Sequence, residues 1–313
     1  MGTYLTTLGA VLPVFLIVAL GFSLRKGGWF TAEADRTVLQ LVLKVFYPCF
    51  IFRNILGNEA LLGGTNFVVA PLMGVVAVGI GFLLAWPLAL LFFPGQRTRQ
   101  RTLIFCLGIF NFGYLAIPLM DRFFGEGNVG VLLVFNVGVE LTMWTVGIFI
   151  LSGTGMKGAW KKLLNPPVIA MALAMSINLL GWAEAVPEFV QTFTRMVGAC
   201  AIPMGLLVSG CMVADFHRSM RVREGLRTLT AALLVRLGLA PLAFLGLALF
   251  LPLSLEIKQV LVIQAAMPAG IFPLVITRIY QGDTSIAVTV VIGTTFFSLF
   301  LIPLWISIGM GVL

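Results

Sequence analysis

Charged residues are scarce in this 313-residue chain, which contains 10% Asp, Glu, Lys and Arg and 60% hydrophobic residues. Soluble domains carry about 25% charged residues, so this composition excludes a soluble protein and predicts one that crosses a membrane several times. The Lys and Arg residues lie between apolar segments and form no basic stripe. The net charge of +8 therefore does not indicate nucleic-acid binding.

Residues that bind metals or form disulfides are also few. The chain has four cysteines, with no CxxC pair, and a single histidine, His217, in a basic loop. Scattered cysteines within apolar segments are expected to pack as small hydrophobic residues. We therefore predict no disulfide framework, no metal site and no resident cofactor.

Sequence motifs of enzymes and nucleotide-binding proteins are missing. The chain contains no Walker motif and no H-E-x-x-H sequence. A G-x-G-x-x-G match at residues 153–158 follows an expected membrane segment and precedes a basic loop, whereas a dinucleotide site needs a strand before it and a helix after it. We interpret this match as a connector, and an enzyme is not expected.

Ten apolar segments are long enough to cross a membrane, which requires about 20 residues. They are 3–24, 37–56, 67–93, 102–120, 129–151, 164–182, 193–214, 229–251, 259–280 and 285–310. Loops on one side of the membrane would hold 14 Lys and Arg and those on the other side four, with Lys44 and Arg236 inside segments. Because basic loops stay in the cytoplasm, we expect a multi-pass plasma-membrane protein with both termini outside the cytoplasm.

Prolines repeat at nearly one offset in the two halves of the chain. Four pairs are 154 or 155 residues apart: Pro13 and Pro167, Pro48 and Pro203, Pro87 and Pro241, and Pro118 and Pro273. We therefore predict one five-helix repeat at residues 1–151, a cytoplasmic connector at 152–163 and a second repeat at 164–313. Since five is odd, the second repeat must be inverted relative to the first, as is common in secondary transporters.

Two apolar segments contain residues that interrupt helices. Residues 107–120 read LGIFNFGYLAIPLM and residues 265–273 read AAMPAGIFP, and the repeat offset aligns the two. In hydrocarbon each unpaired backbone group costs several kcal/mol, so such breaks persist only inside protein or beside a wet cavity. Paired breaks in corresponding places indicate a transport site. We therefore predict that helices four and nine cross at mid-membrane, with Asn111 facing Pro268.

With these features, the chain resembles the auxin efflux carrier family of bacterial and plant transporters. The resemblance rests on NFGYLAIPL in segment four, MPAGIFPLVITRIYQGD in segment nine and TTFFSLFLIPLW in segment ten. It implies a crossover fold in which segments 3–5 and 8–10 move against segments 1, 2, 6 and 7. It also implies organic acids such as malonate and malate as substrates of bacterial members and auxin as that of plant members. The plant pattern has an Asn-Pro pair at each crossover, whereas here Asn111 lacks the proline and Pro268 lacks the asparagine.

The ends of the broken helices predict the charge of the substrate. Free N–H groups and the helix dipole at an N-terminal end favour an anion, most simply a carboxylate. The Asn111 amide either binds that carboxylate or caps the break, and Tyr114 either donates its hydroxyl or packs. The predicted substrate-binding residues are Asn111, Gly113, Tyr114, Met267, Pro268, Ala269, Gly270, Arg236 and Gln264.

Charged residues inside membrane segments are functional candidates by default. Glu140, with Asn136 one turn before it, is predicted to bind a coupling proton or cation. The alternative is a structural ion pair with a Lys or Arg inside a segment. Lys44 and Arg236 either snorkel or pair structurally, or contact the anion. Of the two we favour Arg236, because a guanidinium binds a carboxylate through two hydrogen bonds.

Together these residues predict an all-α secondary transporter that moves a small organic anion by alternating access. The alternative is a sodium- or proton-coupled ion exchanger, or a bile-acid-type symporter, of the same architecture. Exchangers of this shape usually carry paired acids, and here Glu140 alone lies at mid-depth. The expected partners are an organic acid, protons or Na+, and the lipid bilayer, with no nucleic acid. The sequence leaves substrate identity, direction, coupling ion and a homodimer open.

Overall fold

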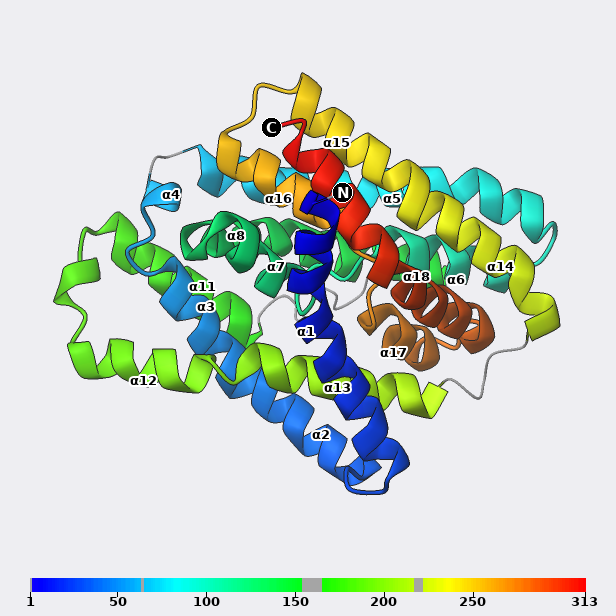
Figure 1. The fold of residues 1–313 in the computed structure, drawn as a ribbon, viewed down its shortest axis with the longest axis horizontal. Helices are drawn as coiled ribbons and strands as arrows, with labels where there is room; N and C mark the ends of the chain where they lie inside the picture. The colour runs from blue at the N-terminus through cyan, green and yellow to red at the C-terminus, as the bar shows by residue number, and fades with distance from the viewer. Residues whose placement is uncertain (1, 63–64, 154–164, 217–221) are drawn as a thin grey trace.

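The computed structural model describes residues 2–62, 65–153, 165–216 and 222–313, and these residues form helices with no strand (Figure 1). In the first half, the helices are α1 (Gly2–Lys26), α2 (Ala32–Leu41), η1 (Val42–Phe46), α3 (Tyr47–Ile55), α4 (Glu59–Leu62), α5 (Asn66–Phe92), α6 (Arg97–Gly108), α7 (Ala116–Phe124), α8 (Glu126–Thr142), η2 (Met143–Gly147) and α9 (Ile148–Ser152). In the second half, they are α11 (Pro166–Leu179), η3 (Ala183–Ala185), α12 (Glu188–Gly198), α13 (Ala201–Phe216), α14 (Val222–Leu234), η5 (Val235–Leu239), α15 (Ala240–Phe250), α16 (Leu255–Ala266), α17 (Phe272–Ile279) and α18 (Thr284–Met310). Most of the predicted connector lies outside the described residues.

Seven helical stretches of the described chain are long and apolar enough to cross a membrane. They are Tyr4–Lys26, Glu33–Ile55, Asn66–Phe92, Glu126–Ser152, Glu188–Phe216, Gly225–Phe250 and Thr284–Met310. They coincide with seven of the ten expected segments. The other three contain the 14-residue helix α11 and the two interrupted pairs α6–α7 and α16–α17. The described residues therefore form an all-helical structure with seven candidate membrane spans, and the ten-segment repeat stays a prediction.

The two interruptions lie where glycine, asparagine and proline gather in the sequence. Helix α6 ends at Gly108 and α7 begins at Ala116, while α16 ends at Ala266 and α17 begins at Phe272. Prolines lie in the first turns of α7 and α17, where a missing N–H costs nothing because those donors have no helical partner. Each second helix of an interrupted pair therefore has a proline in its first turn, where proline is well tolerated.

Three of the candidate membrane helices contain a π-helical turn that the sequence does not predict: η1, η2 and η5. Pro48 and Pro241 follow η1 and η5 closely. A proline clashes with the carbonyl four residues earlier and cannot donate to it, so a wider turn relieves the crowding. At η5 the carbonyl of Leu237, four residues before Pro241, instead accepts a hydrogen bond from Nε1 of Trp305 at 2.9 Å.

The helices pack in two groups (Figure 1). In one, α1 packs along α13, and α3 packs on α11 and α12; we call this the α1/α13 group. In the other, α5 packs on α6 and α8, α15 on α16, and α18 on α6, α14 and α16; we call this the α6/α18 group. Helix α1 also packs on α18, so the groups are in contact. Both interrupted pairs belong to the α6/α18 group.

Candidate functional site

The two helix breaks are joined through their backbones. The N–H of Asn111 donates to the carbonyl of Pro268 at 2.8 Å, and the N–H of Gly270 donates to the carbonyl of Ile109 at 2.9 Å. The residues between these bonds form an isolated antiparallel β-bridge. The predicted approach of Asn111 to Pro268 is confirmed, whereas the crossing of helices four and nine at mid-membrane stays a prediction. Backbone groups that lost their helical partners at one break are thus paired with backbone groups of the other break.

Other backbone groups of the breaks, which lack helical hydrogen-bond partners, are bound by buried side chains. The carbonyl of Phe112 accepts hydrogen bonds from Nδ2 of Asn136 at 3.0 Å and from Nε2 of Gln264 at 3.2 Å. The N–H of Ala269 donates to the hydroxyl of Thr294 at 3.1 Å. Asn136 and Gln264 are buried and outside the cavity lining, so they stabilise the break from within the protein.

Arg236 lies on η5 and is fully buried. Its Nε donates to the carbonyl of Met267 at 2.9 Å, and its Nη2 donates to that of Gln264 at 3.0 Å. These carbonyls form the C-terminal end of α16, where a cation is favoured by the helix dipole. The guanidinium also lies over the rings of Phe110 and Phe244, at 4.8 and 5.3 Å from their centroids. Arg236 therefore caps the second break.

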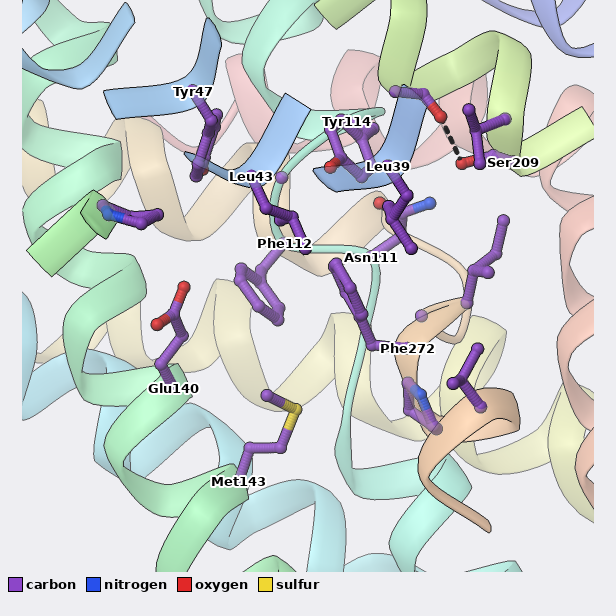
Figure 2. Close-up of a pocket in the computed structure, with 18 of the residues that line it drawn as sticks. Leu39, Leu43, Tyr47, Asn111, Phe112, Tyr114, Glu140, Met143, Ser209 and Phe272 are labelled. Atoms are coloured by element: carbon purple, nitrogen blue, oxygen red, sulfur yellow. Dashed lines mark hydrogen bonds between the residues drawn. The ribbon is translucent and has the colours of Figure 1, made fainter. Parts of the chain in front are cut away.

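A cavity of about 350 Å³ lies between the two helix groups, beside the breaks (Figure 2). Both breaks line it. The lining residues are Leu39, Leu43, Lys44, Tyr47, Phe110, Asn111, Phe112, Gly113, Tyr114, Glu140, Met143, Trp144, Asn165, Pro166, Pro167, Gly205, Val208, Ser209, Met212, Gly270, Ile271, Phe272, Pro273 and Val275. Most of these side chains are apolar, and a few polar groups converge among them, as in small-molecule sites.

The side-chain oxygen of Asn111 faces the start of α7, and its side-chain nitrogen is available to a ligand. Its Oδ1 accepts a long hydrogen bond of 3.5 Å from the N–H of Leu115, just before α7. Its Nδ2 has no partner among the described residues. In Figure 2 the Asn111 side chain lies in the middle of the cavity, near Leu39 and Tyr114. Capping and ligand contact are therefore compatible roles of one amide.

Aromatic rings form much of the cavity wall around Asn111. The ring of Tyr114 lies 6.4 Å from that of Tyr47 and 6.3 Å from that of Phe272. A side chain at Gly205 would overlap the Tyr114 ring, so this glycine allows α13 to approach the break. The wall therefore combines rings from both helix groups.

Glu140 enters the cavity from α8 (Figure 2). Its Oε2 accepts a hydrogen bond from Nδ2 of Asn165 at 3.5 Å. The Oδ1 of Asn165 caps α11 by accepting from the N–H of Val168 at 3.0 Å. Glu140 makes no ion pair with any described Lys or Arg, so the structural ion pair considered from the sequence is not present in this part of the chain. Asn136 lines only a small adjacent cavity with Glu140 and Tyr47.

The structure divides the predicted substrate-binding residues into two sets. Asn111, Gly113, Tyr114 and Gly270 line the cavity. The others, Met267, Pro268, Ala269, Gln264 and Arg236, are outside the lining and hold the breaks together. This placement does not support the predicted contact of Arg236 with substrate, because a residue's depth in a segment does not specify which side of the helix faces a ligand.

Several lining residues were not predicted as site residues. Tyr47, Asn165 and Ser209 are polar residues inside or beside apolar segments, and that contrast is the one sequence signal that could have found them. No group of three or more His, Cys, Asp or Glu that could bind a metal occurs among the described residues.

An all-helical chain with several membrane-spanning helices and a cavity at two joined breaks is typical of a membrane transporter. The family model described as "Membrane transport protein" matches residues 6–160 and 155–306. The chain belongs to this family, and the predicted relationship to auxin efflux carriers is confirmed. Its family and its relatives are transporters and not enzymes.

Three relatives illustrate the similarity. An uncharacterized transporter of Methanocaldococcus jannaschii is 22% identical over 94% of this chain and 96% of its own length. The uncharacterized transporter YfdV of Escherichia coli (strain K12) is 22% identical over 96% of this chain and 97% of its own length. Auxin efflux carrier component 7 of Arabidopsis thaliana is 26% identical over 42% of this chain and 22% of its own length.

Proposed function

We propose that this protein is a secondary transporter that moves a small organic anion across the bacterial inner membrane. The observation that carries the proposal is the backbone pairing of the two breaks beside one cavity between two helix groups. Alternating access follows if the α6/α18 group moves against the α1/α13 group, because the cavity walls then part on one side and meet on the other.

Helix ends at the cavity favour an anion. The first turns of α7 and α17 begin beside the lining residues Tyr114 and Phe272. The helix dipoles present a positive partial charge at these ends. The free Nδ2 of Asn111 adds a donor in the same place. A carboxylate satisfies all of these groups, and the apolar walls suit the organic part of its molecule.

The proposed architecture has ten crossing segments in two inverted five-segment repeats, at residues 1–151 and 164–313. The seven spanning helices, the two interrupted pairs and α11 would be those segments. The excess of Lys and Arg on one side supports an orientation with both termini outside the cytoplasm.

Glu140 is the proposed coupling residue, because it is the one acidic residue that lines the cavity among the described residues. A proton or Na+ bound there would neutralise a charge inside the membrane, where an isolated carboxylate is costly. A single acid favours the organic anion as the substrate over an exchanger that carries only ions.

A binding screen tests the proposal. Purified protein would be heated in detergent with benzoate, phenylacetate, malonate or succinate, and with the corresponding uncharged amides as controls. A ligand at about 100 times its Kd stabilises the native state by about 2.7 kcal/mol, which a shift in Tm reports. We expect at least one acid, and none of the amides, to raise the Tm. Proteoliposomes loaded with that acid should then exchange it. Equal stabilisation by an acid and its amide, or no exchange, would contradict the proposal.

A further inference from the structure

Two opposite charges share the cavity without contacting each other. Lys44 lies on the π-helical turn η1 of the α1/α13 group, and Glu140 lies on α8 of the α6/α18 group. Among the described lining residues, Lys44 is the one cation and Glu140 the one acid. Tyr47 and Tyr114 are the other titratable side chains of that lining, and both are phenols. Each helix group therefore contributes one charged residue to the lining.

Neither charge is neutralised by a described residue. Glu140 accepts a single hydrogen bond, at 3.5 Å from Asn165, and Lys44 makes no ion pair within the described part of the chain. Lys44 is exposed, so a ligand that enters the cavity can reach its ammonium group. Glu140 is half-buried within an apolar helix, where an ionised carboxylate without a counter-charge is costly.

We propose that Lys44 binds the carboxylate of the substrate and that Glu140 competes with that carboxylate for Lys44. This inference rests on the proposed function, because it names the residue that recognises the anion. It also replaces Arg236 as the cation of the site, because Arg236 is outside the cavity lining and its Nε and Nη2 are bound to the carbonyls at the end of α16.

Competition for one cation couples the anion to a proton. Lys44 is the one cation of the described lining, so its charge favours an ionised Glu140 across the cavity even without contact. When a substrate carboxylate occupies Lys44, that charge is neutralised, and Glu140 takes one proton from water to become a neutral carboxylic acid. When the substrate leaves, Lys44 regains its free positive charge, and Glu140 releases the proton to become a carboxylate again. One monoanion and one proton then cross together, and the loaded site carries no more net charge than the empty one.

Binding measurements on three variants test the role of Lys44. The probe is whichever of benzoate, phenylacetate, malonate or succinate binds the wild-type protein most tightly, measured by calorimetry in detergent. Lys44→Gln should weaken binding by about tenfold or more, because a hydrogen bond to a charged group is lost. Lys44→Arg should keep most of the affinity. Lys258→Gln removes a lysine of α16 outside the lining and should bind as the wild type does.

A double-mutant cycle separates competition from a structural role. Glu140→Gln removes the competitor and should tighten binding while Lys44 is present, yet should change little in a Lys44→Gln background. In weakly buffered solution, the wild-type protein should take up about one proton per bound anion where Glu140 is ionised, and Glu140→Gln should take up none. This second measurement keeps the native lysine, so it decides the matter even if Lys44→Gln does not fold.

The outcomes distinguish the two proposals. If no acid binds the wild-type protein, the proposed function is wrong and this inference fails with it. If an acid binds equally well to the wild type and to folded Lys44→Gln, Lys44 merely extends toward the membrane surface and this inference alone is overturned. Equal tightening by Glu140→Gln in both backgrounds, or no proton uptake, would likewise refute the competition while leaving anion transport intact.

Discussion

The backbone N–H of Asn111 donates to the carbonyl of Pro268 at 2.8 Å, and this bond joins the two halves of the chain at the cavity. The same residue keeps its side-chain Nδ2 free. Backbone and side chain of Asn111 therefore do different things: the first holds the breaks together, and the second is available to a ligand.

Replacing Asn111 by alanine should weaken transport without unfolding the protein. The substitution keeps the backbone bond to Pro268 and removes the amide, including a hydrogen bond worth about 1.5–3 kcal/mol if its partner is a carboxylate. We expect uptake of the acid identified in the screen to fall by about tenfold in proteoliposomes. Asn128→Ala is the matched control, because Asn128 bonds Phe124 and Gln259 outside the cavity lining. Unchanged uptake in Asn111→Ala would remove this residue from the binding site.

The breaks were predictable because their causes are local. Glycine, asparagine and proline within an apolar run are costly in a membrane unless tertiary contacts satisfy the backbone, and the repeat offset pairs the two runs. The predicted pairing of Asn111 and Pro268 needed no knowledge of the fold. The side chains that satisfy the break, such as Asn136 on Phe112, follow less directly, because several polar residues share those segments.

The remaining wall of the cavity depends on tertiary packing. Tyr47 and Ser209 reach the site because α3 and α13 lie against the breaks, which no local pattern specifies. Arg236 and Lys44 show the same limit. Both lie within apolar segments, and the sequence favoured the guanidinium. In the structure, Arg236 on η5 binds the carbonyls at the end of α16, whereas Lys44 on η1 lines the cavity.

Alanine in place of glycine should destabilise the protein at one break and leave its stability unchanged at the other. A Cβ at Gly270 would lie 2.9 Å from the carbonyl oxygen of Phe110, so Gly270→Ala must push the breaks apart. We expect a loss of about 1–3 kcal/mol, as for other overpacked positions, and a lower Tm. A Cβ at Gly113 would meet only the Tyr47 hydroxyl at 3.8 Å, so Gly113→Ala should fold as the wild type does. Equal Tm values for the two variants would contradict the close backbone approach at Gly270.

Arg236 should matter for stability more than for contact with substrate. Arg236→Met leaves the carbonyl of Met267 without its donor, whereas the carbonyl of Gln264 keeps the N–H of Met267 at 3.3 Å. A buried unpaired acceptor costs about 1–3 kcal/mol. We expect a much lower Tm in Arg236→Met and a smaller loss in Arg236→Lys, which keeps a donor and the charge. The protein that remains folded should keep its affinity for the acid in calorimetry. Loss of affinity at unchanged Tm would instead place Arg236 in contact with the ligand.

Trp305 should act through the proline that follows η5. Its Nε1 donates to the Leu237 carbonyl, and Pro241, four residues later, has no N–H that could donate to that carbonyl in place of the indole. Trp305→Phe should therefore destabilise the protein by about 1–3 kcal/mol, the cost of an unpaired acceptor. Pro241→Ala restores an N–H four residues after that carbonyl and should reduce the cost of Trp305→Phe. The two changes should therefore be non-additive by about 0.5 kcal/mol or more in thermal unfolding. Trp182→Phe, at an exposed tryptophan, is the control and should leave the Tm unchanged. Strict additivity would show that the indole stabilises α18 by packing alone.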